Sequence, residues 1–190
     1  MKKLFFFIIL SINCYFISNT IAFSGVLSAT TGEVKQEYKK AYFAGGCFWC
    51  MEESFDKVKG VIKSISGYSG GHVKNPTYRQ VIYEETGHVE AIQVFYDPKL
   101  TNYEELLKVF WLNIDPFDAN GQFCDKGKSY RSVAFYQNLK EKKFIENSIS
   151  DIEKKFNEKK IVTLVWKFDK FYPAEDYHQD YYQNNFLRYL

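Results

Sequence analysis

Apolar and polar residues follow one another in patterns that predict strands and helices in alternation along the chain. Alternating or short apolar runs, typical of strands, occur in five segments: 40–46, 60–71, 88–98, 131–138 and 161–168. Helices are expected over 47–58, 76–83, 101–114 and 174–183, and a longer one is indicated by an apolar face of Ile145, Ile149, Ile152 and Phe156. The stretch 115–130 has neither pattern and is expected to be irregular.

The order of these segments indicates one domain in which helices pack on a single sheet. Helices and strands interleave with short connections, which is typical of α+β and α/β folds. The sequence contains no internal repeat, no Pro/Gly/Ser-rich linker and no low-complexity run. Two helix starts carry polar signals. Glu52 and Glu53 lie early in the 47–58 helix, where the dipole favours acids, and Thr101 is a candidate cap with Glu104 three residues later.

The first 24 residues have the features of a secretory signal peptide. Lys2 and Lys3 precede the apolar run LFFFIIL, and the small residues Ala22 and Ser24 mark a plausible cleavage site. An uncleaved membrane anchor is the alternative, but polar residues interrupt the apolar stretch. We therefore expect residues 1–24 to direct export, to the periplasm or as a secreted protein, with membrane tethering if the signal stays attached.

Charge gives no indication of a polyanionic partner. The chain has 25 Lys and Arg against 23 Asp and Glu, and two of these lysines lie in the signal segment, so the mature chain is neutral. Neutrality argues against nucleic acid and against stable membrane association as modes of action. About 165 residues remain, enough for one domain with its own core. We expect a monomer, with residues 25–39 as an N-terminal extension and residues 40–190 as the domain.

Three cysteines follow the signal segment: Cys47, Cys50 and Cys124. Three are too few for a disulfide scaffold, and an odd number leaves one free or working thiol. Cys47 follows a strand and a Gly pair and opens a helix, so unpaired N–H groups and the helix dipole should lower its pKa. We therefore expect Cys47 to be a reactive thiol rather than a buried structural cysteine.

Cys50 lies one helical turn after Cys47, within disulfide range, and several interpretations of the pair compete. A zinc site would need two more ligands, and the remaining candidates, Cys124 and three histidines, have no paired spacing, so no metal is expected. A thioredoxin-like thiol–disulfide exchanger fits Cys-x-x-Cys after a strand, although Phe48 and Trp49 are bulky for its tight turn. A thiol reductant and a non-catalytic binding module with an aromatic pocket are the other interpretations.

Five blocks of sequence resemble, in this order, the peptide methionine sulfoxide reductase A family: GGCFWCMEESF, GYSGGHVKNPTYRQV, TGHVEAIQVFYDP, DKGKSYRSVAFY and FYPAEDYHQDYY. The resemblance extends from about Phe43 to Arg188, nearly all of the mature chain. It implies an α+β fold with a ferredoxin-like split βαβ core, in which helices flank a mixed sheet. It also implies reduction of methionine S-sulfoxide, free or in proteins, to methionine.

The resemblance also implies roles for individual residues. Cys47 would attack the sulfoxide sulfur, while Phe48 and Trp49 would hold the methyl group of the substrate. Tyr78 and Tyr130 match the two phenols that hydrogen-bond the sulfoxide oxygen. Asp125 matches the acid that helps to position the substrate, whereas His178 and Asp176 are expected only to support the fold or the residues that contact the substrate.

Glu90 matches the family's acid, and its strand supports the role independently. It shares a strand face with Ile92, Val94 and Tyr96, so its carboxyl should lie in apolar surroundings. Desolvation would raise its pKa and keep it protonated near neutral pH. A protonated carboxyl can then transfer its proton to the sulfoxide oxygen as the sulfur is attacked.

The regeneration of Cys47 is where the chain departs from its relatives. The family chemistry implies a sulfenic acid on Cys47 and then a disulfide reduced by thioredoxin or an equivalent dithiol, with no metal or organic cofactor. Many relatives have resolving cysteines in a glycine-rich tail, but no cysteine follows Cys124 here, and Cys124 occupies a position that is not cysteine in others. We expect Cys50 to resolve the sulfenic acid because of its short loop, with Cys124 as the alternative.

Overall fold

The structure is a computed structural model, and it describes residues 37–185 of the 190-residue chain. These residues belong to one compact unit, Lys35–Leu190. The predicted signal segment, 1–24, lies outside the described residues, as does nearly all of the predicted extension 25–39. None of the helices within the described range is long and apolar enough to cross a bilayer.

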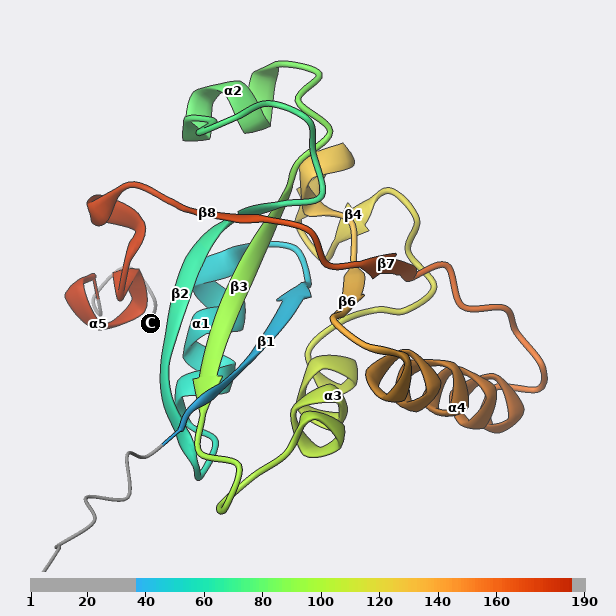
Figure 1. Cartoon of the computed structure of the whole chain (residues 1–190). Helices are drawn as coiled ribbons and strands as arrows, with labels where there is room; N and C mark the ends of the chain where they lie inside the picture. Colours follow the sequence, from blue (N-terminus) through green and yellow to red (C-terminus); the bar gives the residue numbers. More distant parts are fainter. Residues whose placement is uncertain (1–36, 186–190) are drawn as a thin grey trace, which may run out of the picture. The chain divides into compact units, whose positions relative to one another are not determined.

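A six-stranded sheet, a separate two-stranded hairpin and five α-helices make up the described part of the chain (Figure 1). The strands of the sheet are β1 (Lys39–Ala44), β2 (Val61–Ser69), β3 (Val89–Tyr96), β6 (Val133–Tyr136), β7 (Leu164–Lys167) and β8 (Phe171–Pro173). The hairpin consists of β4 (Gly121–Gln122) and β5 (Asp125–Lys126). The helices are α1 (Phe48–Asp56), α2 (Tyr78–Tyr83), α3 (Tyr103–Leu112), α4 (Leu139–Lys155) and α5 (Tyr181–Asn184).

The strand order across the sheet is β7-β6-β1-β3-β2-β8. Neighbouring strands are antiparallel except β6 and β7, which are parallel. Because β3 lies between β1 and β2, the β1–α1–β2 connection is a split βαβ unit, and β3–α3–β6 is a second one around β1. The predicted α+β fold with a split βαβ core and a mixed sheet is therefore confirmed.

The main core lies between the sheet and helices α1, α3 and α4. Phe43 of β1 is fully buried there, and its ring stacks on Phe55 of α1 and on Phe110 of α3, each at a centroid distance of 5.2 Å. Ile92 and Val94 of β3 face the same core. The opposite face of the sheet buries a smaller cluster under the β7–β8 region, made of Tyr42, Ala44, Val89, Ala91, Val133 and Phe135.

Three local predictions are wrong in detail. Helix α3 begins after Asn102, whose side chain accepts a first-turn backbone N–H at 3.1 Å, so Thr101 is not the cap. The stretch 115–130, expected to be irregular, contains the β4–β5 hairpin and a 3₁₀ turn, Lys128–Tyr130. Within 174–183 only short pieces are helical, and the strand β8 before it has no predicted counterpart. Strands of two or three residues are too short to produce a periodic pattern.

A Gly-Gly turn joins β1 to α1 and brings the β4–β5 hairpin against the start of the helix. A Cβ at Gly45 would lie 2.6 Å from Met51 Sδ, and a Cβ at Gly46 would lie 2.6 Å from Gln122 Cβ. Gly46 also has φ +81°, a conformation that glycine adopts freely. Gln122 is fixed in turn, because its Oε1 accepts the Asp115 N–H at 2.6 Å and its Nε2 donates to the Asp115 C=O at 3.0 Å. The turn therefore depends on the absence of side chains.

We expect Gly46→Ala to destabilise the protein by more than its backbone conformation alone would. A left-handed φ costs an L-residue about 1–2 kcal/mol, and the clash with Gln122 adds an overpacking cost of about 1–3 kcal/mol. Gly87→Ala is the matched control, since Gly87 has φ +74° but an added Cβ there meets nothing closer than 3.4 Å. Urea unfolding should show the larger loss of unfolding free energy for Gly46→Ala, and equal losses would contradict the close approach.

Candidate active site

Cys47 is the N-cap residue of α1, and its side chain makes no capping hydrogen bond. The half-buried thiol is hydrogen-bonded to the Cys50 side chain, and the Cys50 N–H also points at it. The hydrogen bond to Cys50, then burial, and then the nearby charges of Cys50 and Glu90 raise the pKa of Cys47 above its ordinary value. The prediction that the helix N-terminus lowers this pKa is therefore wrong. The dipole is outweighed because the thiol proton is shared with a second sulfur in a water-poor site.

Glu90 lies on the central strand β3, on the face covered by α1, and is 2% exposed. Its Oε2 accepts the N–H of Phe48, the first residue of α1, at 3.0 Å. Burial raises the pKa of Glu90 to about 8, against the lowering effect of that N–H, and Asp125 and Cys50 add to the rise. The carboxyl is therefore protonated at neutral pH, as the apolar face of its strand predicts.

Two phenols and a second acid face Glu90 from other parts of the chain. The hydroxyls of Tyr78, at the start of α2, and Tyr130, in the 3₁₀ turn, share a hydrogen bond. Burial raises the pKa of both phenols, and the charge of Glu90 contributes to both rises. The half-buried Asp125 of β5 contributes to the raised pKa of Tyr130 and of Glu90. The structure thus brings these four predicted site residues close enough to interact with one another.

A cluster of aromatic rings surrounds the start of α1. The Phe48 ring is 1% exposed, with centroids 5.0 Å from His178 and 6.3 Å from Tyr78. The half-buried Trp49 ring stacks on Tyr181 at 3.7 Å, with 9° between the planes. His178 in turn lies 4.5 Å from Tyr78. Within this cluster the Phe48 ring is therefore buried, whereas the Trp49 indole is partly exposed.

His178, expected only to play a supporting role, and Tyr181, which the sequence leaves unassigned, both belong to this cluster. The His178 side chain is 2% exposed, and neither ring nitrogen has a hydrogen-bond partner among the described residues. Burial lowers its pKa, so the imidazole is neutral. The density of aromatic residues in the block FYPAEDYHQDYY is a signal for such a cluster, but its helical spacing does not reveal which rings turn inward.

Glu175 is a second residue that the sequence leaves unassigned. Its Oε1 accepts the Tyr78 N–H at 2.9 Å, and its Oε2 accepts the Tyr68 hydroxyl at 2.8 Å. Tyr68 pairs in register with Glu90 across β2 and β3, and its ring lies 6.0 Å from that of Phe48. One carboxylate therefore fixes the helix that presents Tyr78 relative to the strand beside the acid.

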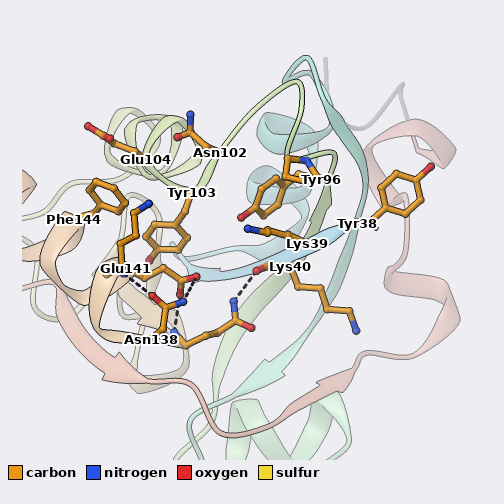
Figure 2. A pocket seen from close by; sticks show the side chains of 13 residues that line it. Tyr38, Lys39, Lys40, Tyr96, Asn102, Tyr103, Glu104, Asn138, Glu141 and Phe144 are labelled. Atoms are coloured by element: carbon orange, nitrogen blue, oxygen red, sulfur yellow. Dashed lines mark hydrogen bonds between the residues drawn. The ribbon is translucent and has the colours of Figure 1, made fainter. Parts of the chain in front are cut away.

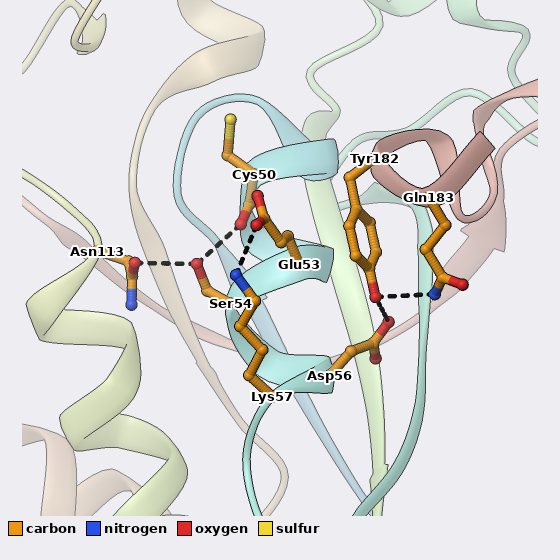
Figure 3. A network of polar contacts seen from close by, with 8 residues as sticks. All are labelled: Cys50, Glu53, Ser54, Asp56, Lys57, Asn113, Tyr182 and Gln183. Carbon is orange, nitrogen blue, oxygen red and sulfur yellow. Dashed lines mark hydrogen bonds and ion pairs between the residues drawn. The ribbon is translucent and has the colours of Figure 1, made fainter. Parts of the chain in front are cut away.

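The two candidate resolving thiols lie in different settings, and none of the three described cysteines is in a disulfide. Cys50 is on the first turn of α1, where Figure 3 shows its side chain directed along the helix away from Lys57. Its C=O accepts the Ser54 hydroxyl at 2.9 Å. Cys124 is exposed at the tip of the β4–β5 hairpin. The structure thus brings Cys50 into contact with Cys47 and places Cys124 on an exposed turn.

Hollows in the surface also lie away from Cys47. One of about 660 Å³ lies at the opposite end of β1 from Cys47, and Figure 2 shows Lys39, Tyr103 and Glu141 among the side chains around it. No residue predicted for the site lines it. Within residues 37–185, no group of three or more His, Cys, Asp or Glu side chains is placed to hold a metal ion.

Comparison with solved structures finds the same fold. Methionine sulfoxide reductase A of Corynebacterium diphtheriae superposes with a TM-score of 0.72 at 28% identity, covering 79% of this chain and 76% of that one. Mxr1 of Saccharomyces cerevisiae in its reduced form gives a TM-score of 0.72 at 30% identity, covering 78% of this chain and 86% of that one.

Comparison of sequences finds the same family. The peptide methionine sulfoxide reductase MsrA of Listeria monocytogenes is 50% identical over 82% of this chain and 88% of its own length. That of Bacillus velezensis is 49% identical over 76% of this chain and 82% of its own. The family model described as peptide methionine sulfoxide reductase matches residues 39–190. The chain therefore belongs to the peptide methionine sulfoxide reductase family.

Proposed function

We propose that this enzyme reduces methionine S-sulfoxide, free or in oxidised proteins, to methionine at Cys47. The observation that carries the proposal is the buried Glu90 carboxyl, which accepts the first N–H of the helix that Cys47 opens and whose pKa is raised by burial. A sulfoxide is reduced only if its oxygen is protonated as a nucleophile attacks its sulfur. A thiol and a buried acid in this arrangement supply both groups.

In the first step Cys47 takes the oxygen from the substrate. The Cys47 sulfur attacks the sulfoxide sulfur and forms an S–S bond with it, while Glu90 donates its proton to the oxygen. The hydroxyl then passes to the Cys47 sulfur as the S–O and S–S bonds to the substrate sulfur break, which leaves a sulfenic acid on Cys47 and releases methionine. The proton that Cys47 releases restores the Glu90 carboxyl, so the net change is thiol plus sulfoxide to sulfenic acid plus thioether.

The surrounding side chains hold the sulfoxide for this attack. The Phe48 and Trp49 rings form an apolar surface suited to the methyl group, which also keeps water from the reacting atoms. The paired hydroxyls of Tyr78 and Tyr130 donate hydrogen bonds to the sulfoxide oxygen. Asp125 faces the same space from β5 and helps to orient the substrate.

Cys50 resolves the sulfenic acid in the second step. Its thiol attacks the Cys47 sulfur, the S–O bond of the sulfenic acid breaks as the Cys47–Cys50 disulfide forms, and the hydroxyl leaves with the Cys50 proton as water. The existing hydrogen bond between the two side chains supports this assignment, because little chain has to move. Cys124 would have to be brought from the hairpin tip, and it is the alternative resolving thiol.

A dithiol protein of the thioredoxin type then reduces this disulfide by thiol–disulfide exchange. The exposed position of Cys50 gives such a donor access, and the proposal assigns no metal or organic cofactor. Export is proposed from the signal-like residues 1–24, which place the enzyme and its reductant in the periplasm or outside the cell. A neutral mature chain is consistent with a monomer that acts on diverse proteins.

A thioredoxin-like exchanger remains the second candidate because Cys47 and Cys50 are in contact, and turnover of the two sulfoxide epimers with dithiothreitol separates the candidates. We expect the enzyme to reduce the S epimer alone and to leave the disulfides of insulin intact. Cys47→Ser should lose turnover completely, because no other described group can attack the sulfur. Reduction of insulin without reduction of either sulfoxide epimer would identify an exchanger. Absence of both activities would identify a binding module. Residual turnover in Cys47→Ser above a few per cent would remove Cys47 from its role.

Glu90→Gln should slow the first turnover by about 10²–10⁴-fold, because the amide keeps the shape but has no proton to transfer. The wild-type rate should fall as pH rises through about 8, the pKa of Glu90, and the variant should lack this decline. Methionine formed per enzyme in a single turnover is the measurement. Glu85→Gln, at an exposed ion pair with Lys128, is the control. A Glu90→Gln rate within about threefold of wild type would defeat the assignment.

Cys50→Ser should release one methionine per enzyme and then stall with thioredoxin as donor, while it stays active with a small dithiol. The first half of the reaction needs only Cys47, but thioredoxin needs a disulfide to attack. Cys124→Ser is the matched control and should behave like wild type. Peptide mapping of the oxidised wild-type enzyme checks the pairing, and a 47–124 disulfide without a 47–50 one would show Cys124 to be the resolver.

A further inference from the structure

The C-terminal segment, residues 174–185, supplies one side of the aromatic cluster through His178 and Tyr181. It is fastened to β2 by Gln179, whose Oε1 accepts the Ser66 N–H and whose Nε2 donates to the Ser66 C=O, both at 3.0 Å. The position of these rings therefore depends on how firmly this segment is held against the rest of the protein.

Helix α1 holds the same segment at a second place. The Tyr182 hydroxyl donates to Asp56 Oδ2 at 3.1 Å and accepts from Gln183 Nε2 at 2.8 Å, as Figure 3 shows. Asp56 Oδ1 in turn accepts the Ser64 N–H at 2.9 Å. The two carboxylate oxygens of Asp56 are thus used for contacts to β2 and to the C-terminal segment.

Glu52 makes a further attachment from inside the protein. It lies three residues after Trp49, on the same side of α1, and is 1% exposed. Its Oε2 accepts the Asp180 N–H at 3.1 Å, while its Oε1 and the nearby Ser66 Oγ are buried without a hydrogen-bond partner among the described residues. Asp180 itself has φ +51°, which is uncommon outside glycine. The prediction that Glu52 complements the helix dipole is wrong, because the residue lies beyond the first turn and points into the protein.

The charges that face Glu52 are all acidic. Asp56 lies one turn further along α1, and Asp180 faces it from the C-terminal segment, while β2 contributes the neutral Ser66 hydroxyl. Burial, then Asp180, then Asp56 raise the pKa of Glu52 to about 8, and the nearby Ser66 hydroxyl and the Asp180 N–H oppose the rise only in part. Glu52 is therefore protonated at neutral pH, and its ionisation would put a buried negative charge beside the half-buried Asp56 and the exposed Asp180.

We propose that Glu52 is a positioning residue whose neutral carboxyl holds the C-terminal segment on α1 and so keeps His178 and Tyr181 in place beside Phe48 and Trp49. When Glu52 ionises, repulsion from Asp56 and Asp180 and the loss of hydration together favour a state in which the segment lifts and the carboxylate reaches water. In that state the Tyr181 ring leaves Trp49, and the enzyme binds its substrate more weakly. Glu52 touches no reacting atom and acts through the segment.

The test is the pH dependence of half-saturation by free methionine S-sulfoxide, measured in single turnovers so that no reductant is needed. If closure requires the protonated form, the half-saturating concentration in wild type should rise about tenfold between about pH 7 and about pH 9. Glu52→Gln keeps an oxygen for the Asp180 N–H and cannot ionise, so its value should stay within about twofold over that range. Glu90 is intact in both proteins, so its titration is common to them.

Glu53→Gln is the matched control, since Glu53 is the next residue of α1 and forms an ion pair with Lys57 at 2.6 Å. It should follow the wild-type pH profile. A profile in Glu52→Gln that rises with wild type, or profiles that are flat in both, would overturn the proposal. Glu52→Ala should not replace Glu52→Gln, because loss of the acceptor leaves the Asp180 N–H without a partner at every pH.

Hydrogen exchange of wild type alone gives a second readout that needs no variant. Protection of the backbone amides in 174–185, corrected for intrinsic exchange, should fall between about pH 7 and about pH 9 by the same factor of about ten. Unchanged protection would overturn the proposal even if Glu52→Gln failed to fold. The half-saturation experiment rests on the proposed function, whereas the hydrogen-exchange experiment does not. An enzyme that reduced no sulfoxide would therefore refute the function and leave the role of Glu52 to be decided by exchange.

Discussion

The hydrogen bond between the Phe48 N–H and the Glu90 carboxyl joins the two elements on which the site depends. Antiparallel pairing of β1 with β3 puts the end of β1 beside the start of β3, so the helix that follows β1 begins directly over Glu90. The Gly-Gly turn keeps the connection from β1 to α1 short, and Cys47 lies at the start of that helix. The split βαβ topology thus places an acid and a nucleophile side by side although they are far apart in sequence.

Burial has opposite consequences for these two groups. It raises the pKa of Glu90 to about 8, which keeps a transferable proton available at neutral pH. It also contributes to the raised pKa of Cys47, which disfavours the thiolate. Both effects follow from the removal of the two groups from water. In the proposed mechanism such surroundings favour protonation of the sulfoxide oxygen over prior ionisation of the thiol, and oxygen protonation makes the sulfur electrophilic.

What could be predicted from the sequence reflects the range of the interactions involved. The Glu90 environment follows from alternation along one strand, and the strand–Gly-Gly–Cys–helix junction is local, so both are visible in the pattern. The pKa of Cys47 depends on a second side chain and on burial by distant segments, and a local argument gives the wrong sign for it. The predicted cap of α3 is wrong for a different reason. Thr101 and Asn102 are adjacent polar residues, and only the backbone geometry decides which of them caps the helix. The contacts of four further residues could not be predicted because their partners lie far along the chain: His178, Tyr181, Glu175 and Glu52.

The attachment of the C-terminal segment also fixes when the site is completed as the chain is made. The Glu52–Asp180 and Tyr68–Glu175 contacts join residues 128 and 107 positions apart. The strands and the helix that carry Cys47 and Glu90 lie in the first half of the described chain, whereas His178 and Tyr181 of the aromatic cluster come from its last residues. A chain still emerging from the ribosome therefore carries the Cys47 thiol before His178 and Tyr181 can pack against Phe48 and Trp49. The aromatic cluster is completed last, when residues 174–185 dock on β2 and α1.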